Sequence, residues 1–415
     1  MSQVLPSNRT LVKAIAVFGG AQVFTVLAAL VRSKVAAVTI GAAGVGLNAI
    51  YTTLAGFLGV LMSFGLTNSS VPTICQQADE ASRREAIAHV RLLGYILSVL
   101  AIPISLIASL WYEAESAWLA LAVVALVQSY IEGAVLRSLH ATRRLSTSQV
   151  AGALLSVVCT VPFFVWLGHD GIIWAVVCAT MAASAVTCWQ GYRACDALPS
   201  AVMLNRDLLR WARPLLTLGF AFLLSGLMMQ GCDLVIQRWF TMTADLSVVG
   251  LYKAGYQLSI IYPCMLFAAV ANDYYPRLAD ICSDMALRNR LVKREMRLLF
   301  IIALPATALL WVLMPYIIPL ILSQEFLTVI PMVRVGLFSL LLRALYLPIA
   351  YIPVASARSL HYLLLEGISW SLLVVCIIAG YSWHDFSGIG WGILLSNALD
   401  LIFAWVFCRI KYHFR

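Results

Sequence analysis

The sequence predicts an all-α, polytopic membrane protein that crosses the bilayer about twelve times. Of its 415 residues, 62% are hydrophobic and only 11% are charged, whereas soluble domains contain about 25% charged residues. A membrane-spanning helix needs roughly 20 apolar residues, and runs of this length occupy well over half of the chain. The predicted spans are residues 12–38, 46–70, 89–110, 117–138, 148–168, 171–192, 212–239, 248–274, 297–321, 327–353, 359–381 and 388–408.

The connectors between these spans predict the orientation of the chain. Most of the 28 lysines and arginines lie on one set of connectors and tails, whereas the opposite connectors carry acids such as Glu115, Asp245 and Asp385. The positive-inside rule therefore places both termini in the cytoplasm. The net charge of +9 is then a topology signal, and we expect no binding of nucleic acid.

No connector is long enough to form an extramembrane catalytic domain, so we predict no enzymatic activity and no catalytic residue. The ten cysteines contain no C-x-x-C pair and mostly lie in apolar runs, which argues against a metal site. The sequence also lacks the G-x-x-x-x-G-K-[ST] motif of ATP hydrolysis by a Walker mechanism. We therefore expect neither a metal nor a cofactor.

A weak internal repeat divides the spans into two groups of six. A shift of 204 positions superposes Lys34 on Arg238, residues 45–47 on 249–251, Asn68 on Asn272, and Pro72 on Pro276. Six is an even number, so both halves enter the membrane in the same direction, and a pseudo-two-fold axis along the membrane normal relates them. We predict six-helix lobes at residues 1–195 and 212–415, joined by a cytoplasmic linker at 196–211.

Charged residues inside the spans are candidates for a binding site, because a charge near the bilayer centre costs roughly 2.5–3.5 kcal/mol. Arg343 lies about mid-way along its span and is the strongest candidate. Lys34 and Arg238 lie near the outer ends of their helices, so they either extend to the interface or face a cavity. Their equivalence in the repeat favours the cavity. Two weaker candidates are Arg32, about 200° around the helix from Lys34, and Lys253, near the interface.

Acidic and amide side chains in the spans are candidates for ion coupling or for lining a cavity, namely Asp233, Asn68, Asn272 and Asp273. A carboxylate in a span either carries a coupling proton or pairs with a base that holds two helices together. Asp233 precedes Arg238 by five residues, which is a poor spacing for a pair on one helix. It therefore either pairs across helices or is protonated. For Arg343 the alternative to substrate binding is a structural pair with a buried acid such as Asp233 or Asp400.

Four segments carry a family resemblance. They are KVAAVTIGAAGVG at 34–46, the segment 249–280 with its Tyr-Pro-Arg-Leu exit, LILSQEF at 320–326 before an arginine-bearing span, and GIGWG at 388–392. Together they resemble the Wzx-type O-antigen and lipid-linked oligosaccharide flippases, which are polysaccharide transporters of the multidrug/oligosaccharidyl-lipid/polysaccharide exporter superfamily. The resemblance runs over essentially the whole chain, although its motifs are loose patterns.

This resemblance implies two six-helix lobes around a central cavity that work by alternating access. The implied substrate is an undecaprenyl-pyrophosphate-linked oligosaccharide, which would move from the cytoplasmic to the periplasmic leaflet of the bacterial inner membrane. Lys34, Arg238 and Arg343 would then pair with the pyrophosphate. The implied partners are this lipid-linked substrate, membrane lipids, a glycan polymerase and a chain-length regulator.

Three other functions compete with this interpretation. A multidrug or cation exporter of the same superfamily typically needs carboxylates in the first helix, where this chain has Arg32 and Lys34. A major-facilitator-type transporter also has parallel six-helix halves, but the connector CQQADEASRREA at 75–86 lacks the Gly-x-x-x-Asp-Arg-x-Gly pattern of that family. A membrane-embedded glycan polymerase is disfavoured because the outer connectors are short.

Overall fold

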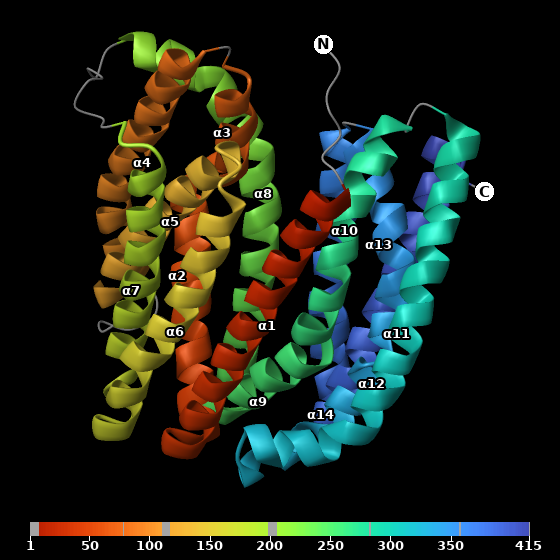
Figure 1. Cartoon of the computed structure of the whole chain (residues 1–415). Helices are drawn as coiled ribbons and strands as arrows, with labels where there is room; N and C mark the ends of the chain where they lie inside the picture. The colour runs from red at the N-terminus through yellow and green to blue at the C-terminus, as the bar shows by residue number, and fades with distance from the viewer. Residues whose placement is uncertain are drawn as a thin grey trace. The chain divides into compact units, whose positions relative to one another are not determined.

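The computed structural model describes residues 8–77, 79–109, 117–197, 206–281, 284–356 and 358–414. These residues are almost entirely helical and contain no β-strand (Figure 1). Within these ranges, nine helices are long and apolar enough to cross a membrane, and a bent pair, Gln324–Gly336 with Ser339–Ala355, brings the number to ten. The predicted fold class, an all-α multi-pass membrane protein, is confirmed.

The helices of the first half are α1 (Asn8–Thr39), α2 (Gly41–Ser63), α3 (Leu66–Cys75), α4 (Glu80–Ser109), α5 (Leu119–Ser138), α6 (Thr142–Trp166), α7 (Ile172–Ala194) and α8 (Arg206–Thr243). Those of the second half are α9 (Leu246–Tyr256), the π-helix η3 (Gln257–Ile261), α10 (Tyr262–Asp280), α11 (Met285–Ile321), the 3-10 helix η4 (Gln324–Val329), α12 (Ile330–Gly336), α13 (Ser339–Ala355) and α14 (Ser359–Tyr412).

The chain forms two compact units. The first consists of Met1–Ile40 with Ile50–Gln230, and the second of Gly41–Ala49 with Gly231–Arg415. Within the first unit, α6 packs against α1 and α7, and α5 packs against α4 and α7. Within the second, α13 packs against α11 and α14. The predicted six-helix lobes and their pseudo-two-fold relationship stay a prediction.

The last helix, α14, accounts for two predicted spans. A straight helix of its 54 residues would be about 80 Å long, far more than the roughly 30 Å of a bilayer core. The backbone leaves the helical conformation at His384 and Asp385, and the two parts fold back on each other. A Cβ atom on Gly380 would overlap the carbonyl oxygen of Gly388, and one on Gly392 would overlap that of Cys376. The predicted spans 359–381 and 388–408 are therefore the two arms of a helical hairpin.

The eighth predicted span, 248–274, is continuous but irregular. It consists of α9, the π-helical turn η3 and α10. The wider turn changes the direction of the side chains that follow it, and such turns are frequent at functional sites.

Aspartate side chains begin three of the helices, as expected for a residue whose carboxylate accepts hydrogen bonds from free backbone N–H groups. Asp245 accepts from the N–H of Leu246 at 2.6 Å, and Asp284 accepts from that of Leu287 at 3.0 Å. Before α4, Asp79 accepts from the hydroxyl and the N–H of Ser82. These hydrogen bonds hold the pKa of the Asp79 carboxyl below its usual value.

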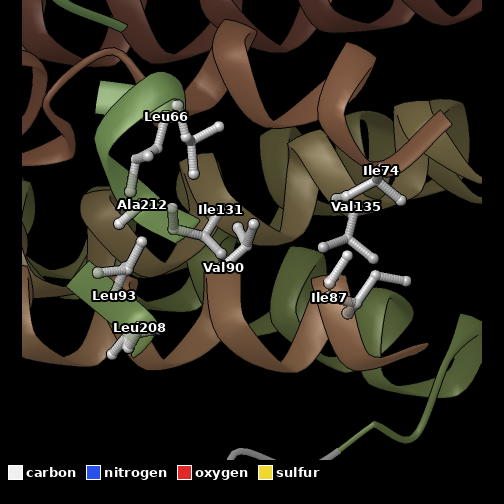
Figure 2. Close-up of a cluster of buried hydrophobic side chains, with 11 residues drawn as sticks. Leu66, Ile74, Ile87, Val90, Leu93, Ile131, Val135, Leu208 and Ala212 are labelled. Carbon is white, nitrogen blue, oxygen red and sulfur yellow. The ribbon is translucent and has the colours of Figure 1, made fainter. Parts of the chain in front are cut away.

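A cluster of buried aliphatic side chains joins α3, α4, α5 and α8 in the first unit (Figure 2). In Figure 2, Ile74, Ile87 and Val135 gather at one end of this cluster, and Leu93 and Leu208 lie toward the other. Apolar contact holds these helices together at the end of the unit where α4 begins.

Candidate functional site

Arg343 lies on α13 of the second unit, a helix of mostly apolar residues. Its Nε donates a hydrogen bond to Oδ1 of Asn397 on α14 at 2.9 Å. The amide nitrogen of Asn397 donates to the carbonyl oxygen of Ile393 at 2.7 Å, and this second bond orients Oδ1 toward the guanidinium. The sequence predicted that Arg343 lies in the middle of a span, and in the structure it is hydrogen-bonded to the neutral side chain of Asn397.

The surroundings of Arg343 are polar but contain no ion pair to it. The guanidinium interacts electrostatically with Cys264, Tyr256, Tyr346 and Asp400. Among the described residues, no carboxylate lies within ion-pair distance of Arg343. A full positive charge in an apolar span is thus stabilised by neutral groups and a more distant acid.

The two acids nearest this cluster are engaged with other side chains. Asp400 is buried, and its Oδ2 accepts a hydrogen bond from the hydroxyl of Ser369 at 2.7 Å. Its Oδ1 has no hydrogen-bond partner. Glu366 accepts from the indole N–H of Trp370 at 2.9 Å. The two helical arms of α14 therefore carry the acids, and α13 carries the base.

Asp233 and Lys253 form an ion pair between α8 and α9. Their side chains are 19% and 21% exposed, respectively, so the pair is largely shielded. The sequence left two possibilities for Asp233, a pair across helices or protonation. In the structure Asp233 is paired with Lys253 across two helices. The ammonium group of Lys253, which we predicted as a further contact to an anion, thus has a carboxylate beside it.

The π-helical turn η3 explains how one span contributes two groups near Arg343. Tyr256 and Cys264 are eight residues apart, and in a regular α-helix they would point about 80° apart around the axis. The wider turn at Gln257–Ile261 between them reduces this offset. Both side chains interact electrostatically with the guanidinium.

The remaining predicted site residues are distributed over both units. Lys34 and Arg32 are partly buried on α1 of the first unit, and both have interaction partners. Asn68 on α3 is exposed. Arg238 on α8 of the second unit is exposed and has an interaction partner. The side chains of two predicted residues lie outside the described part of the chain, namely Asn272 and Asp273. A joint role of these residues stays a prediction.

Asn397 is the principal residue of the cluster that the sequence analysis missed. The sequence did contain a signal, because Asn397 and Asp400 are spaced three apart in an apolar run and so share one face of a helix. Neither their spacing nor their polarity identifies the helix that this face contacts. The tertiary structure alone brings Asn397 to Arg343.

Comparisons with known proteins identify a family and a fold. The family model described as "Polysaccharide biosynthesis protein" matches residues 11–282. No curated protein matches the chain. The chain is similar to an inward-facing multidrug resistance MATE family transporter of the MOP superfamily, with a TM-score of 0.75 and 15% identity over 96% of this chain and 98% of that one. It is similar to a mutant of the Vibrio cholerae MATE transporter VcmN, with a TM-score of 0.65 and 15% identity over 99% of both chains. It is also similar to a MOP superfamily transporter from Pyrococcus furiosus, with a TM-score of 0.67 and 14% identity over 97% of this chain and 96% of that one.

The family match covers well over half of the 415 residues, and the structural matches extend over nearly the whole chain at low sequence identity. This chain therefore belongs to the polysaccharide biosynthesis protein family, and it has the fold of the MATE transporters of the MOP superfamily.

Proposed function

We propose that this protein is a flippase for an undecaprenyl-pyrophosphate-linked oligosaccharide, such as an O-antigen-like repeat unit. It would move this substrate from the cytoplasmic to the periplasmic leaflet of the bacterial inner membrane by alternating access. The observation that carries the proposal is Arg343, a mid-span arginine whose hydrogen-bonded partner is the neutral side chain of Asn397.

An anionic substrate would offset the energetic cost of this arginine. A charge at the bilayer centre costs roughly 2.5–3.5 kcal/mol, and a neutral amide recovers only part of that. The bond to Asn397 uses Nε, so donors remain on the two Nη groups. A guanidinium binds phosphate oxygens through two parallel charge-assisted hydrogen bonds, and a pyrophosphate offers several such oxygens. Lys34 and Arg238 are proposed as further contacts to the same anion.

Family and fold support the same class of function. The family is that of polysaccharide biosynthesis proteins, and the fold is that of membrane exporters. The Pyrococcus furiosus transporter is described as having a binding pocket of reverse polarity, which suggests a different function for that protein. The corresponding feature in this chain would be Arg32 and Lys34, two bases in the first helix, where cation exporters typically need carboxylates.

A multidrug or cation exporter of the same superfamily is the second candidate. The buried carboxylate of Asp400, which has one oxygen without a hydrogen-bond partner, favours it, because a cationic drug needs a negative group. In this alternative Arg343 would weaken the binding of every cationic substrate near it.

The leaflet distribution of the glycan precursor tests the proposal. Deletion of the gene should abolish surface glycan, and the lipid-linked precursor should accumulate on the cytoplasmic leaflet. A membrane-impermeant lectin measures this, because it reaches the cytoplasmic leaflet in inverted vesicles and the periplasmic leaflet in right-side-out vesicles. A normal amount of precursor on the outer leaflet, with only the glycan chain length changed, would contradict it. Loss of drug resistance with unchanged glycan would support the exporter instead.

A further inference from the structure

The first unit contains a pocket of about 580 Å³ at the end where α4 begins and α7 ends. Three arginines line it, Arg83 and Arg84 from α4 and Arg193 from α7. Glu80 and Asp196 are the acids of the lining. The pocket volume lies within the range of small-molecule sites, roughly 300–1,000 Å³.

The positive charges of the three lining arginines exceed the negative charges of the two lining acids. Arg84 pairs with Glu80 at 3.3 Å, but both side chains are mostly exposed, so the pair is weak and open to exchange. Arg83 and Arg193 form no ion pair with any described residue. The carboxylate of Asp196 is the one remaining negative charge of the lining beside these two guanidinium groups, so the net charge of the lining is positive.

One of the lining arginines has a buried donor without a hydrogen-bond partner. The Nε atom of Arg83 is shielded from solvent and has no hydrogen-bond partner in the part of the chain that the structure describes. Buried polar atoms in folded proteins are normally hydrogen-bonded, so an exception needs an explanation. An acceptor atom bound in the pocket would supply the missing partner.

The wall of the pocket is held in place by a buried ion pair. Arg91 is fully buried, and its Nε and Nη2 each donate to the carboxylate of Glu132 at 2.7 Å. Its Nη1 donates to the carbonyl oxygens of Cys195 at 2.9 Å and Ala197 at 2.7 Å. The guanidinium also lies 4.1 Å from the ring centroid of Tyr192. Because Glu132 neutralises Arg91, this pair shapes the pocket without charging it.

Glycine is required beside this ion pair. A Cβ atom on Gly191 would overlap the carboxylate of Glu132, so a larger residue there would push α7 away from α5. The end of α7, which forms one wall of the pocket, is thus packed closely against α5, and a site that is already formed loses less entropy on binding.

We propose that this pocket binds a phosphate group, carried either by the headgroup of an anionic phospholipid or by a soluble phosphate compound. The guanidinium group of Arg83, with its Nε donor, and that of Arg193, which lies 4.9 Å from the ring centroid of Trp189, match the oxygens of a phosphate. Arginine recognises such oxygens through paired charge-assisted hydrogen bonds. The apolar side chains of Ile87 and Leu139 in the lining suit the uncharged part of such a ligand. This site lies in the first unit, and it is independent of Arg343 in the second.

Binding measurements on the purified, delipidated full-length protein test this proposal with two probes. The first is inorganic pyrophosphate, titrated by calorimetry in a non-ionic detergent. The second is phosphatidylglycerol, whose retention is counted by native mass spectrometry after incubation with equimolar phosphatidylglycerol and phosphatidylcholine. Arg83→Gln and Arg193→Gln should each weaken binding by about tenfold. Arg144→Gln is the matched control, because Arg144 is exposed at the start of α6 and does not line the pocket.

A gain-of-affinity variant guards against misfolding as the explanation. Asp196→Asn removes the opposing carboxylate and should tighten binding several-fold, a result that a damaged protein would not produce. Inorganic pyrophosphate also probes the site proposed at Arg343, so each pocket variant is measured in the Arg343→Ala background as well. Binding that persists in this background and is lost with Arg83→Gln belongs to the pocket, so that failure of the flippase proposal and failure of this one can be told apart.

Each outcome of the two-probe experiment decides the proposal. Competition between the probes supports a site for the shared phosphate group, retention of lipid alone supports a headgroup site, and binding of pyrophosphate alone supports a site for a soluble compound. Binding of neither probe would overturn the proposal. An equal loss in Arg144→Gln would also overturn it, because binding would then reflect only the general surface charge.

Discussion

Gly46 in α2 and Gly250 in α9 lie back to back, each against the backbone of the other's helix. A Cβ atom on Gly46 would overlap the carbonyl oxygen of Leu246, and one on Gly250 would overlap that of Ala42. Gly250 is 204 positions after Gly46, and Leu246 is 204 positions after Ala42, so the contact is reciprocal. All four residues belong to the second compact unit.

Reciprocal contact is what an internal repeat predicts where two equivalent segments meet on the repeat axis. The first turns of the two helices are capped by different residues. Glu325 accepts from the N–H of Ala42 at 2.9 Å, and Asp245 accepts from that of Leu246. The crossing itself is symmetric, while the groups that support it have diverged.

Substituting either glycine should therefore destabilise the protein. Gly46→Ala and Gly250→Ala would each force the two backbones apart, and overpacking of this kind costs roughly 1–3 kcal/mol. The melting temperature of the purified protein, followed by intrinsic fluorescence in detergent, should fall in both. Gly133→Ala is the control, because a Cβ there meets nothing within 4 Å. Unchanged melting in both variants would contradict the close crossing.

Arg343 should be essential for transport. Arg343→Ala and Arg343→Glu should abolish glycan export while the protein still inserts, because the pyrophosphate loses its guanidinium. Arg343→Lys should retain part of the activity, since charge remains but the bidentate geometry is lost. Surface glycan is measured against the membrane level of the protein, with Arg290→Ala, an exposed arginine on α11, as the control.

The structural alternative for Arg343 makes an opposite prediction. If the arginine only balances Asp400, the double variant Arg343→Ala with Asp400→Asn should restore export, because removing both charges relieves the unpaired ion. We expect no restoration. Full export by this double variant at the wild-type protein level would eliminate the substrate contact assigned to Arg343.

The ion pair between Asp233 and Lys253 should show strong coupling. Asp233→Asn or Lys253→Met alone removes one half of a largely shielded ion pair, and each should lower the melting temperature. The double variant should melt closer to the wild type than either single variant does. A double-mutant cycle measures this non-additivity. Additive effects would show that the two side chains stabilise the protein independently.

Reporter fusions should confirm the orientation of the chain. Fusions after residues 143, 207 and 290 should report the cytoplasm, and fusions after residues 115, 245 and 385 should report the opposite compartment, because the basic connectors stay inside. A periplasmic signal at residue 290 would overturn the predicted order of spans.

The sequence by itself determined the fold class, an all-α multi-pass membrane protein, while its twelve crossings compare with nine or ten sufficiently long apolar helices among the described residues. Each predicted apolar run lies in a helical part of the chain, but the second run is divided between α2 and α3 and the tenth between η4, α12 and α13. The last two runs are the folded-back arms of α14. It also singled out Arg343 as a candidate, because a charge near the middle of an apolar run is costly in a bilayer. Both features depend on composition within one segment, and composition can be read along the chain.

The tertiary structure alone decided which side chains meet. Arg91 is fully buried against Glu132, and Asn397 reaches Arg343 from a helix 54 positions away. Such pairs depend on how far each helix is rotated about its axis and on which neighbour it faces. Rotation is set by packing between helices, and apolar spans of similar composition encode it too weakly for one sequence to reveal.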